Sequence, residues 1–575
     1  MSNSNMQATT TSLAAQAAGM RAQLTGPGAP FELQQLDVAG QRFSVYKNAF
    51  TDLPALIQAG RAHAAREFIV YEGERWTFER FFAAADALAA RLQQQGLVPG
   101  ARVAIAMRNR PEWAVAFVAT VLAGAVPAPL NSFGLRDELL ANLRDVQPAW
   151  LICDAERHAH VGADLAALRC RALVVDAPAA SAAAGATDWQ LMTAAANAPA
   201  LQPVAVQPDD LALILFTSGA SSQAKGVLSS HRSVCQALFN IDYIGAISAM
   251  TSPEIVAKVM ARGLQPTTLT AVPLFHVSGL HAQLLTALRH GRRLVFMRRW
   301  EPVSALALMQ AEKITQFNGA PAMVGQLLAQ PSFAEVARDG CLGGVGFGGA
   351  GLPQSLIDAV LSLQRDSMSG IGFGMTESNG VGSAASGRLF AARPEASGLV
   401  SPIIDVRIAD FDGQPMPVGE PGEIWLRGVS VMQGYLNQPE GAEAALRGGW
   451  LRTGDIGVLD ADGYLRVVDR IKDVINRAGE KISAAEVESC LLQHAAIEEA
   501  AVFGQADELT GEAVVAVLVI KPGWELDAVG VQQHVRERLA AYKVPAAVHL
   551  RTEQLPRNPA GKMLKSALKK LYAVH

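Results

Sequence analysis

A loop of small residues that ends in a lysine is the part of the sequence whose residue types first suggest chemistry. The segment LFTSGASSQAKGVLSSH at 215–231 leaves an apolar run and reaches Lys225 after a stretch rich in glycine and serine. Backbone N–H groups in such a loop can point at an anion, and the lysine adds a mobile positive charge. The pattern predicts a phosphate site, although an ordinary polar surface loop has the same composition.

Two common nucleotide-binding motifs are not met. The loop of P-loop NTPases needs a second glycine and a Mg²⁺-binding hydroxyl, where this sequence has Ala224 and Gly226. The segment GGVGFGGAGLP at 343–353 contains G-x-G-x-x-G, but the acidic residue that a dinucleotide site needs after the next strand is missing. A P-loop NTPase and a Rossmann dinucleotide site are therefore both disfavoured.

Length, charge and cysteine content narrow the class of protein. The chain has 575 residues, of which 50% are hydrophobic, and a formal net charge of -4. This length predicts two or more domains, and the charge gives no general reason to expect nucleic acid or an anionic membrane as a partner. Five scattered cysteines without a C-x-x-C pair argue against a disulfide framework or a zinc site. Without an export signal or a run of about 18 apolar residues, we expect a cytoplasmic protein with no membrane span.

The spacing of apolar runs predicts the elements that must position such a site. Helical patterns alternate with short apolar runs between about 50 and 300, which predicts βαβ units and mainly parallel, helix-covered sheets. After about 400 the runs are short and closely spaced, and Asp462–Gly463 is a strong hairpin signal, so this part is expected to be antiparallel. We therefore predict an α/β fold with a large N-terminal domain and a small, mobile α+β C-terminal domain. The expected boundaries are a flexible tail or partly helical arm over 1–28, a large domain over 29–470 whose antiparallel part is at about 400–470, and a small domain over 471–575.

Five motifs in a fixed order, and a final loop with a lysine, resemble the adenylate-forming superfamily. This superfamily includes acyl-CoA synthetases, peptide-synthetase adenylation domains and firefly luciferases. The matching segments are TSGASSQAKG at 217–226, the glycine-rich turn at 343–353, GFGMTESNG at 372–380, RTGDIG at 452–457, DRIKDVINRAGEKISAAEVES at 469–489 and LPRNPAGKMLK at 555–565. The first departs from the family's T-S-G-T-T-G-x-P-K-G at Ala220, Ser221, Ser222 and Ala224, from which we expect an altered affinity for ATP.

The resemblance implies a two-domain acid:CoA ligase that uses ATP, Mg²⁺ and CoA. ATP and a carboxylic acid would give an acyl-adenylate and pyrophosphate, after which the small domain would rotate so that CoA forms the thioester. A fatty or aromatic monocarboxylic acid is the expected substrate. Two alternatives stay open: an acyl-AMP ligase that loads a separate carrier protein, and a catalytically weakened nucleotide-binding homologue.

The resemblance also assigns roles to individual residues. Lys562, Thr376, Glu377 and Lys225 would be catalytic, and Glu377 would be the metal ligand because Mg²⁺ prefers hard oxygen ligands. The residues expected to contact ATP or AMP are Thr217, Ser218, Gly219, Ser221, Ser222, Lys225, Gly348, Gly349, Ala350, Phe373, Gly374, Met375, Thr376, Asp455 and Arg470. Lys472 would be the hinge, Gly479 would open the CoA channel, and the acyl pocket would include His276, Asn318, Gly319 and Gly348. His276 could equally be a packed core histidine.

Overall fold

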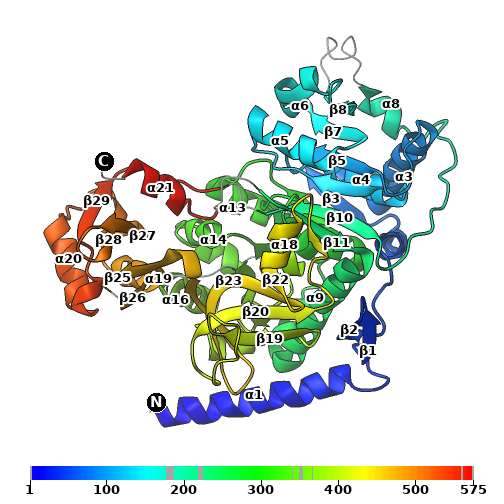
Figure 1. The fold of residues 1–575 in the computed structure, drawn as a ribbon. Coiled ribbons are helices and arrows are strands. Elements are labelled where there is room, and N and C mark those ends of the chain that lie inside the picture. The colour runs from blue at the N-terminus through cyan, green and yellow to red at the C-terminus, as the bar shows by residue number, and fades with distance from the viewer. Residues whose placement is uncertain are drawn as a thin grey trace.

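Helix-covered sheets form the larger, N-terminal part of the protein (Figure 1). The computed structural model describes residues 3–176, 187–217, 224–339, 341–348, 354–364, 367–478, 480–558 and 561–572. Over these residues a nine-stranded sheet has the order β18-β17-β16-β15-β14-β12-β13-β3-β4, and a five-stranded sheet has the order β6-β5-β7-β8-β9. The fold is α/β, with a large sheet-containing N-terminal domain and a smaller C-terminal domain.

The two sheets are mainly parallel, as the alternation of apolar runs and helical patterns predicts. The nine-stranded sheet contains β3 (Glu67–Tyr71), β4 (Glu74–Thr77), β12 (Thr267–Thr270), β13 (Arg293–Phe296), β14 (Gln316–Asn318), β15 (Val345–Gly348), β16 (Gly370–Phe373), β17 (Ser383–Ser386) and β18 (Leu399–Val400). The five-stranded sheet contains β5 (Arg102–Ala106), β6 (Val126–Pro129), β7 (Trp150–Asp154), β8 (Arg171–Val175) and β9 (Thr187–Asp188). Strands β4, β17 and β18 are antiparallel to their neighbours and lie at the two ends of the larger sheet.

Helices cover both sheets, and the most apolar of them is fully enclosed. Helix α4 (Pro111–Leu122) has no polar face, and its rings of Trp113 and Phe117 stack with centroids 5.6 Å apart in the core. A helix that is apolar all round must be buried between layers. The other helices of this part are α2 (Leu53–Ala59), α3 (Phe78–Gln94), α5 (Arg136–Val146), α6 (Ala155–Val161), α8 (Trp189–Thr193), α9 (His231–Thr251), α10 (Pro253–Met260), α11 (Val277–Gly279), α12 (Thr286–His290), α13 (Pro302–Ala311), α14 (Pro321–Leu328), α15 (Phe333–Asp339), α16 (Gln354–Leu363) and α17 (Arg388–Ala392).

Antiparallel strands follow, where the sequence predicts them. A five-stranded antiparallel sheet contains β19 (Ile404–Ala409), β20 (Gly422–Gly428), β22 (Leu446–Arg447), β23 (Trp450–Leu459) and β24 (Leu465–Arg470), with α18 (Pro439–Ala445) beside it. The turn between β23 and β24 contains Gly463, whose φ of 83° needs a residue without a Cβ. Smaller antiparallel units pair β1 (Leu33–Val38) with β2 (Gln41–Tyr46), and β11 (Gly226–Ser230) with both β10 (Leu211–Phe216) and β21 (Gly434–Tyr435).

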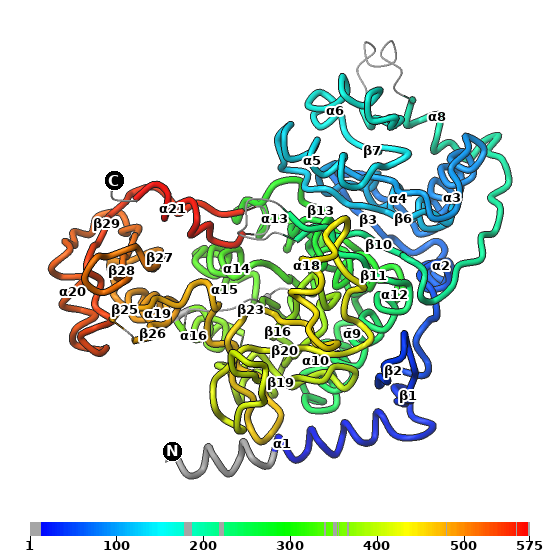
Figure 2. The backbone as a smooth tube through the Cα atoms, in the orientation of Figure 1, coloured from blue at the N-terminus to red at the C-terminus, as the bar shows by residue number. Residues whose placement is uncertain are grey.

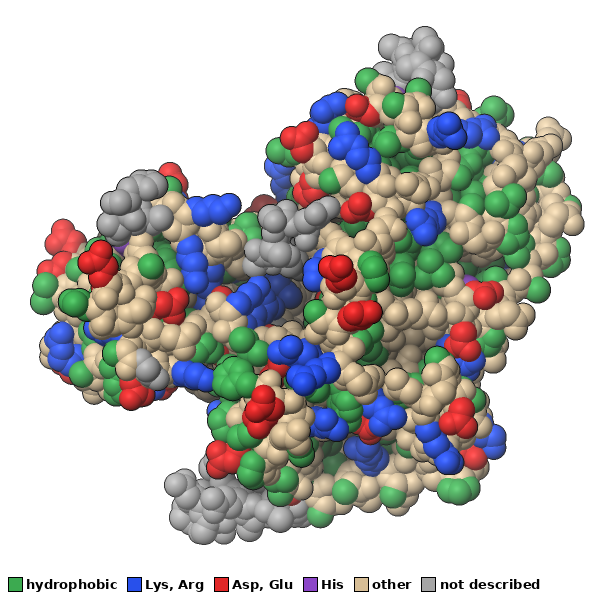
Figure 3. Space-filling model, viewed as in Figure 1, with side chains coloured by type: hydrophobic (Ala, Val, Ile, Leu, Met, Phe, Trp, Pro, Cys, Tyr) green, Lys and Arg blue, Asp and Glu red, His purple; other side chains and the backbone are tan. Residues whose placement is uncertain are grey.

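The C-terminal domain has a sheet and hydrophobic clusters of its own. Its strands are β25 (Val474–Arg477), β26 (Glu480–Ser483), β27 (Ile497–Asp507), β28 (Gly511–Ile520) and β29 (Ala547–Arg551), and its helices are α19 (Ala484–Leu492), α20 (Ala528–Arg536) and α21 (Lys565–Leu571). Figure 2 shows its backbone, in orange and red, beside the N-terminal domain rather than within it. Basic side chains gather where the two parts face each other in the space-filling view (Figure 3).

The first helix is packed onto the N-terminal domain. Helix α1 (Asn3–Thr25) contacts α9, Ala17 is 1% exposed, and the Arg21 guanidinium donates a hydrogen bond to the carbonyl of Val400 at 3.3 Å. The chain is thus helical over residues 3–25 and packs onto the domain through residues 14–24, within the segment 1–28 that the sequence predicts to be a mobile tail or partly helical arm. The composition concealed this because buried alanines make part of the contact, and they leave no stripe of large apolar residues.

We expect Ala17→Glu to release α1, because the substitution places an unpaired charge in a contact without water. Limited proteolysis of the first 30 residues should then be about tenfold faster or more, since burying an unpaired charge costs several times RT. The matched control is Gln16→Glu, which adds the same charge on the exposed face of the helix. Equal cleavage rates in both variants would contradict the docking of α1.

None of the helices in the described parts of the chain is long and apolar enough to cross a bilayer.

Candidate active site

The topology of the larger sheet brings several predicted site residues to one edge. Strands β16, β15, β14 and β12 are parallel neighbours, so their carboxyl ends lie together. Glu377 follows β16, Gly348 ends β15, Asn318 ends β14 and His276 follows β12. Open parallel sheets bind ligands at the carboxyl ends of their strands. The four residues therefore border one candidate site.

Glu377 is a buried carboxylate in the short turn after β16. Its side chain is 8% exposed, and its Oε1 accepts a hydrogen bond from the Tyr435 hydroxyl at 2.9 Å. Burial raises the pKa of Glu377, whereas the Tyr435 hydroxyl and the positive charges of Lys562 and Lys225 favour the ionised form. The site thus contains a buried carboxylate, Glu377, and two cations that offset part of the cost of ionising it away from water.

Lys225 stands at the base of the phosphate loop. The Lys225 backbone N–H donates to Thr217 Oγ1 at 3.2 Å, and the Thr217 N–H donates to the Lys225 carbonyl at 2.9 Å, which closes the loop. The Lys225 ammonium lies 4.7 Å from the centroid of the Tyr435 ring, since β11 pairs with β21. The predicted loop residues Ser218, Gly219, Ser221 and Ser222 lie outside the described residues.

Asp455 and Arg470 face each other across the β23–β24 hairpin. They are directly paired in the strand register, and Arg470 Nε is 3.3 Å from Asp455 Oδ1. Burial raises the pKa of Asp455, while Arg470, Lys562 and Lys472 oppose this shift. Asp455 and Glu377 are thus both influenced by the positive charge of Lys562.

Lys562 enters the site from the C-terminal domain. Its backbone N–H donates to Asn558 Oδ1 at 2.8 Å, and its carbonyl accepts from the Asn558 N–H at 2.8 Å, so a tight loop presents it. A Cβ on Gly561 would lie 2.8 Å from Ala320 Cβ, which shows that this loop rests on the N-terminal domain. Lys562 as a whole residue is exposed, but its ammonium lies near Arg470, Asp455 and Glu377. The loss of surrounding water and the positive charge of Arg470 both lower the pKa of Lys562, whereas the negative charges of Asp455 and Glu377 oppose this shift.

The glycines and the phenylalanine that are expected to contact ATP or AMP differ in exposure. Gly348 and Gly374 are exposed at the ends of neighbouring strands, and a Cβ on Gly374 would lie 2.2 Å from the Gly380 carbonyl oxygen. Thr376 and Met375 are half-buried. Phe373 is 6% exposed and packs into a hydrophobic cluster, so the structure uses its ring mainly in the core. Gly349 and Ala350 lie outside the described residues.

Among the predicted acyl-pocket residues, His276 lies close enough to Lys562 to feel its charge. Burial and, to a smaller extent, the positive charge of Lys562 lower the pKa of His276 to about 4, so the imidazole is neutral near pH 7. Its Nε2 is shut off from water without a hydrogen-bond partner among the described residues. The Asn318 carbonyl accepts from Gln283 Nε2 at 3.1 Å, and Gly319 packs against the Phe317 ring.

The residues predicted to be the hinge and to open the CoA channel lie at the start of the predicted small domain. Lys472 is an exposed residue of the short turn Ile471–Asp473, which joins β24 to β25. Asp469, which the motifs did not single out, accepts from the Ser483 hydroxyl at 2.6 Å and from the Ala485 N–H at 3.1 Å. It ties the start of α19 to the end of β24. Gly479 lies outside the described residues.

Glu377 fits a Mg²⁺ ion that is shared with a phosphate. The described part of the chain contains no group of three or more His, Cys, Asp or Glu side chains placed to hold a metal ion by themselves. Mg²⁺ does not need such a group, because it usually keeps waters and is bound by one or two carboxylates plus substrate phosphates. The buried carboxylate of Glu377 beside Lys225 supplies that kind of ligand.

Tyr435 is a functional candidate that sequence reasoning missed. It lies 58 residues from Glu377 in the chain and belongs to none of the motifs. The signal that could have found it is a single tyrosine in a short strand, which is too common to be informative. Its position comes from the pairing of β21 with β11.

We expect Tyr435→Phe to shift the pH dependence of Glu377. The hydroxyl donates to the carboxylate and favours its ionised form, so its loss raises the pKa of Glu377. The acid limb of the pH profile for ATP–pyrophosphate exchange should move up by about one pH unit, the equivalent of one hydrogen bond to a charged group. Tyr542→Phe, at a largely exposed tyrosine of the C-terminal domain, is the control. An acid limb that does not move would separate Glu377 from the pH dependence.

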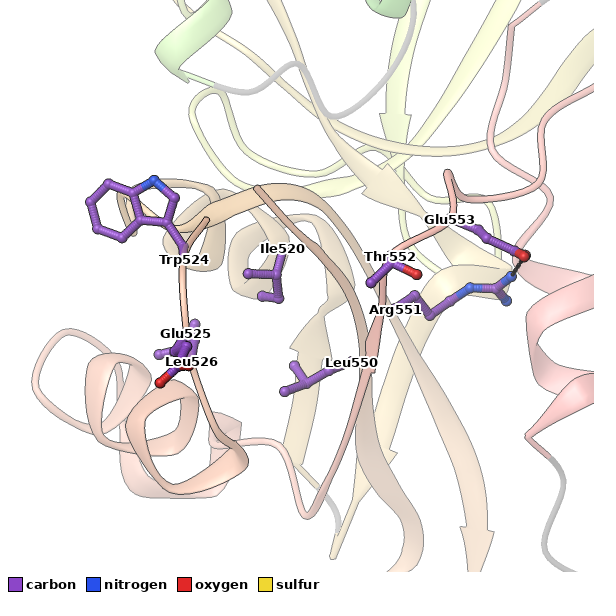
Figure 4. A pocket seen from close by; sticks show the side chains of 8 residues that line it. All are labelled: Ile520, Trp524, Glu525, Leu526, Leu550, Arg551, Thr552 and Glu553. Atoms are coloured by element: carbon purple, nitrogen blue, oxygen red, sulfur yellow. Dashed lines mark hydrogen bonds and ion pairs between the residues drawn. The ribbon is translucent and has the colours of Figure 1, made fainter. Parts of the chain in front are cut away.

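A separate hollow lies on the surface of the C-terminal domain (Figure 4). It is lined by Ile520, Trp524, Glu525, Leu526, Leu550, Arg551, Thr552 and Glu553. None of the residues that the motifs single out belongs to it. It is therefore distinct from the candidate active site.

Comparisons with known proteins agree with this geometry. The chain matches the family model of AMP-binding enzymes over residues 56–436 and that of the AMP-binding enzyme C-terminal domain over residues 486–562. It is 34% identical to a 3-[(3aS,4S,7aS)-7a-methyl-1,5-dioxo-octahydro-1H-inden-4-yl]propanoyl:CoA ligase of Mycobacterium tuberculosis, over 88% of this chain and 95% of that protein. It is 33% identical to a feruloyl-CoA synthase of Amycolatopsis, over 87% of this chain and 94% of that protein.

Solved structures of the same kind align over most of the chain. The o-succinylbenzoate CoA synthetase of Bacillus subtilis, in complex with its acyl-adenylate intermediate, has a TM-score of 0.73 at 28% identity. The alignment covers 90% of this chain and 99% of that one. ATP-bound MatB from Rhodopseudomonas palustris has a TM-score of 0.77 at 26% identity, with the same coverage of 90% and 99%.

Proposed function

The chain belongs to the family of AMP-binding enzymes, and from this premise we propose that it is an ATP-dependent acid:CoA ligase that works through an acyl-adenylate. The observation that carries the proposal is the gathering of Glu377, Asp455 and Lys562 from three separate segments around Lys225 and Arg470. Relatives named as CoA ligases support the reaction class. Its substrates are ATP, CoA and a carboxylic acid.

The arrangement suits the attack of a carboxylate on the α-phosphate. Two anions must approach each other, and the Lys562 ammonium offsets their repulsion as charge develops. Lys225 and Thr217 hold the phosphates at the loop base, and Thr376 lies beside the metal ligand. Mg²⁺ bound at Glu377 would neutralise part of the phosphate charge. Asp455 accepts hydrogen bonds from the ribose hydroxyls, while Arg470 keeps it ionised.

The second half-reaction needs a different surface at the same adenylate. We assign the domain boundary to residues 470 and 471 and the hinge to Lys472, which is exposed in the turn between β24 and β25. Rotation there would withdraw Lys562, which is presented by a loop of the moving domain. The same rotation would bring the segment around Gly479 to the pantetheine chain.

The acid is assigned to the fatty or aromatic monocarboxylic class. Neutral His276, with Asn318, Gly319 and Gly348, would form the side of the site that faces the acyl group, and none of these four residues carries a charge near pH 7. Among the relatives, the feruloyl-CoA synthase and the long-chain-fatty-acid–CoA ligase are named for acids of this kind.

The five cysteines of this chain are all unpaired, which supports a cytoplasmic location.

Product mass spectrometry tests the function. The protein is incubated with ATP, Mg²⁺, CoA and a panel of fatty and aromatic acids, with a parallel reaction that lacks CoA. We expect acyl-CoA and AMP in the first reaction and acyl-AMP in the second. Acyl-AMP that persists in the presence of CoA would favour the loading of a carrier protein. No AMP from any acid would favour the weakened nucleotide-binding homologue.

A further inference from the structure

A buried histidine outside the motifs touches the turn that carries Glu377. His281 lies on the widened helical turn Leu280–Leu285, which follows α11, and it is 1% exposed. Its Nε2 is 3.1 Å from Oδ1 of Asn379, two residues after Glu377. A turn of this π-type is rare and often marks a functional site.

The hydrogen bonds of Asn379 determine which ring nitrogen of His281 carries the proton. Asn379 Nδ2 donates to the Ser430 carbonyl at 2.9 Å, so its Oδ1 is the acceptor that faces the histidine. His281 must therefore donate from Nε2, with Nδ1 unprotonated. Burial lowers the pKa of His281 to about 4, which keeps the ring neutral in this tautomer near pH 7. His281 thus donates to the Asn379 side chain, which in turn donates to the Ser430 carbonyl.

Asn379 also holds a backbone conformation that few residues tolerate. Its φ is 52°, in the left-handed region that asparagine and glycine adopt most readily. Its N–H donates to the Thr376 carbonyl at 3.1 Å and closes the turn around Glu377. The side-chain bond to His281 therefore acts on a residue that itself shapes this turn.

The turn is fixed from two further directions. The Met432 N–H donates to the Glu377 carbonyl at 2.8 Å, and the Tyr435 hydroxyl donates to the Glu377 carboxylate at 2.9 Å. Both contacts come from the segment at 430–435, which Asn379 also reaches through Ser430. His281 adds a link from the turn to a third segment, the one that follows His276.

We propose that His281 is a positioning residue, which acts through Asn379 to orient the Glu377 carboxylate for metal-dependent adenylation. The inference rests on the proposed role of Glu377. A carboxylate that must meet both a metal ion and a phosphate tolerates little misorientation. Loss of the His281 bond should therefore weaken the use of Mg²⁺ and leave the transfer from adenylate to CoA unchanged.

The test compares two variants of similar size in the full-length enzyme. His281→Gln keeps an N–H donor for Asn379, whereas His281→Leu removes it. ATP–pyrophosphate exchange is measured against free Mg²⁺, and thioester formation is measured separately from presynthesised acyl-adenylate and CoA. We expect the leucine variant to need about tenfold more Mg²⁺ for half-maximal exchange, as one lost hydrogen bond to a positioned group allows. We expect the glutamine variant to stay within about twofold of the parent.

Asn379→Gly provides an independent variant, because glycine keeps the positive φ while removing the side chain. It should show the same increase in Mg²⁺ requirement. Its matched control is Asn197→Gly, at an exposed asparagine with a φ of 57°. An unchanged Mg²⁺ curve in the leucine variant, or an equal loss in both half-reactions, would overturn the inference. If Glu377→Gln leaves pyrophosphate exchange intact, the proposed function of Glu377 fails instead.

Discussion

Replacing Lys562 by alanine should abolish most adenylate formation and spare the second half-reaction. The ammonium stands with Asp455 and Glu377 at the site and offsets the repulsion between the attacking carboxylate and the α-phosphate. Removing a positioned charge of this kind typically costs about 10²–10³ in rate. The rate of acyl-AMP formation in a single turnover is the measurement. Thioester formation from presynthesised acyl-adenylate should remain near the parent rate, since the rotated domain has withdrawn the lysine.

The control for Lys562→Ala is Lys570→Ala, which removes the same charge from an exposed position of α21. ATP binding should survive in both variants, because Lys225, Thr217 and Asp455 are unchanged. An adenylation rate equal to that of the parent in Lys562→Ala would remove this lysine from the proposed mechanism. A parallel loss in Lys570→Ala would point to a general effect of charge.

Replacing Glu377 by glutamine should also cause a large loss of adenylation activity. Glutamine keeps the shape and can still accept the hydrogen bond from Tyr435, but it offers Mg²⁺ a neutral amide in place of a carboxylate. We expect adenylation to fall by about 10²-fold, the scale of losing one electrostatic group of an active site. A titration of the exchange reaction with Mg²⁺ should show that excess metal restores it only in part.

The unfolding temperature of Glu377→Gln distinguishes a loss of function from misfolding. Burial raises the pKa of Glu377, so an ionised carboxylate at this position lowers the stability of the folded state. Glu377→Gln should therefore unfold at the same temperature as the parent or at a higher one, while activity falls. The control is Glu440→Gln on the exposed face of α18, which should change neither property. A lower unfolding temperature for Glu377→Gln would indicate that the carboxylate serves the fold.

Local patterns predicted much of the fold because they depend on short stretches of chain. Alternating helices and apolar runs predicted parallel sheets, and Asp462–Gly463 predicted the hairpin of β23 and β24, which the structure contains. The packing of helix α1 was not predicted because a contact made partly by alanines depends on the surface that receives it. Its partner surface includes α9, more than 200 residues away in the chain.

The sequence by itself determined which chemical groups are available, and the resemblance of its motifs to the adenylate-forming superfamily singled out three of them. It identified Glu377, Asp455 and Lys562, and the structure brings these three charges together. Only the tertiary structure decided what surrounds them. Tyr435 and His281 contact the Glu377 turn because strand pairing and sheet order place them there. Such contacts join residues far apart in the chain, and no local pattern of residues encodes them.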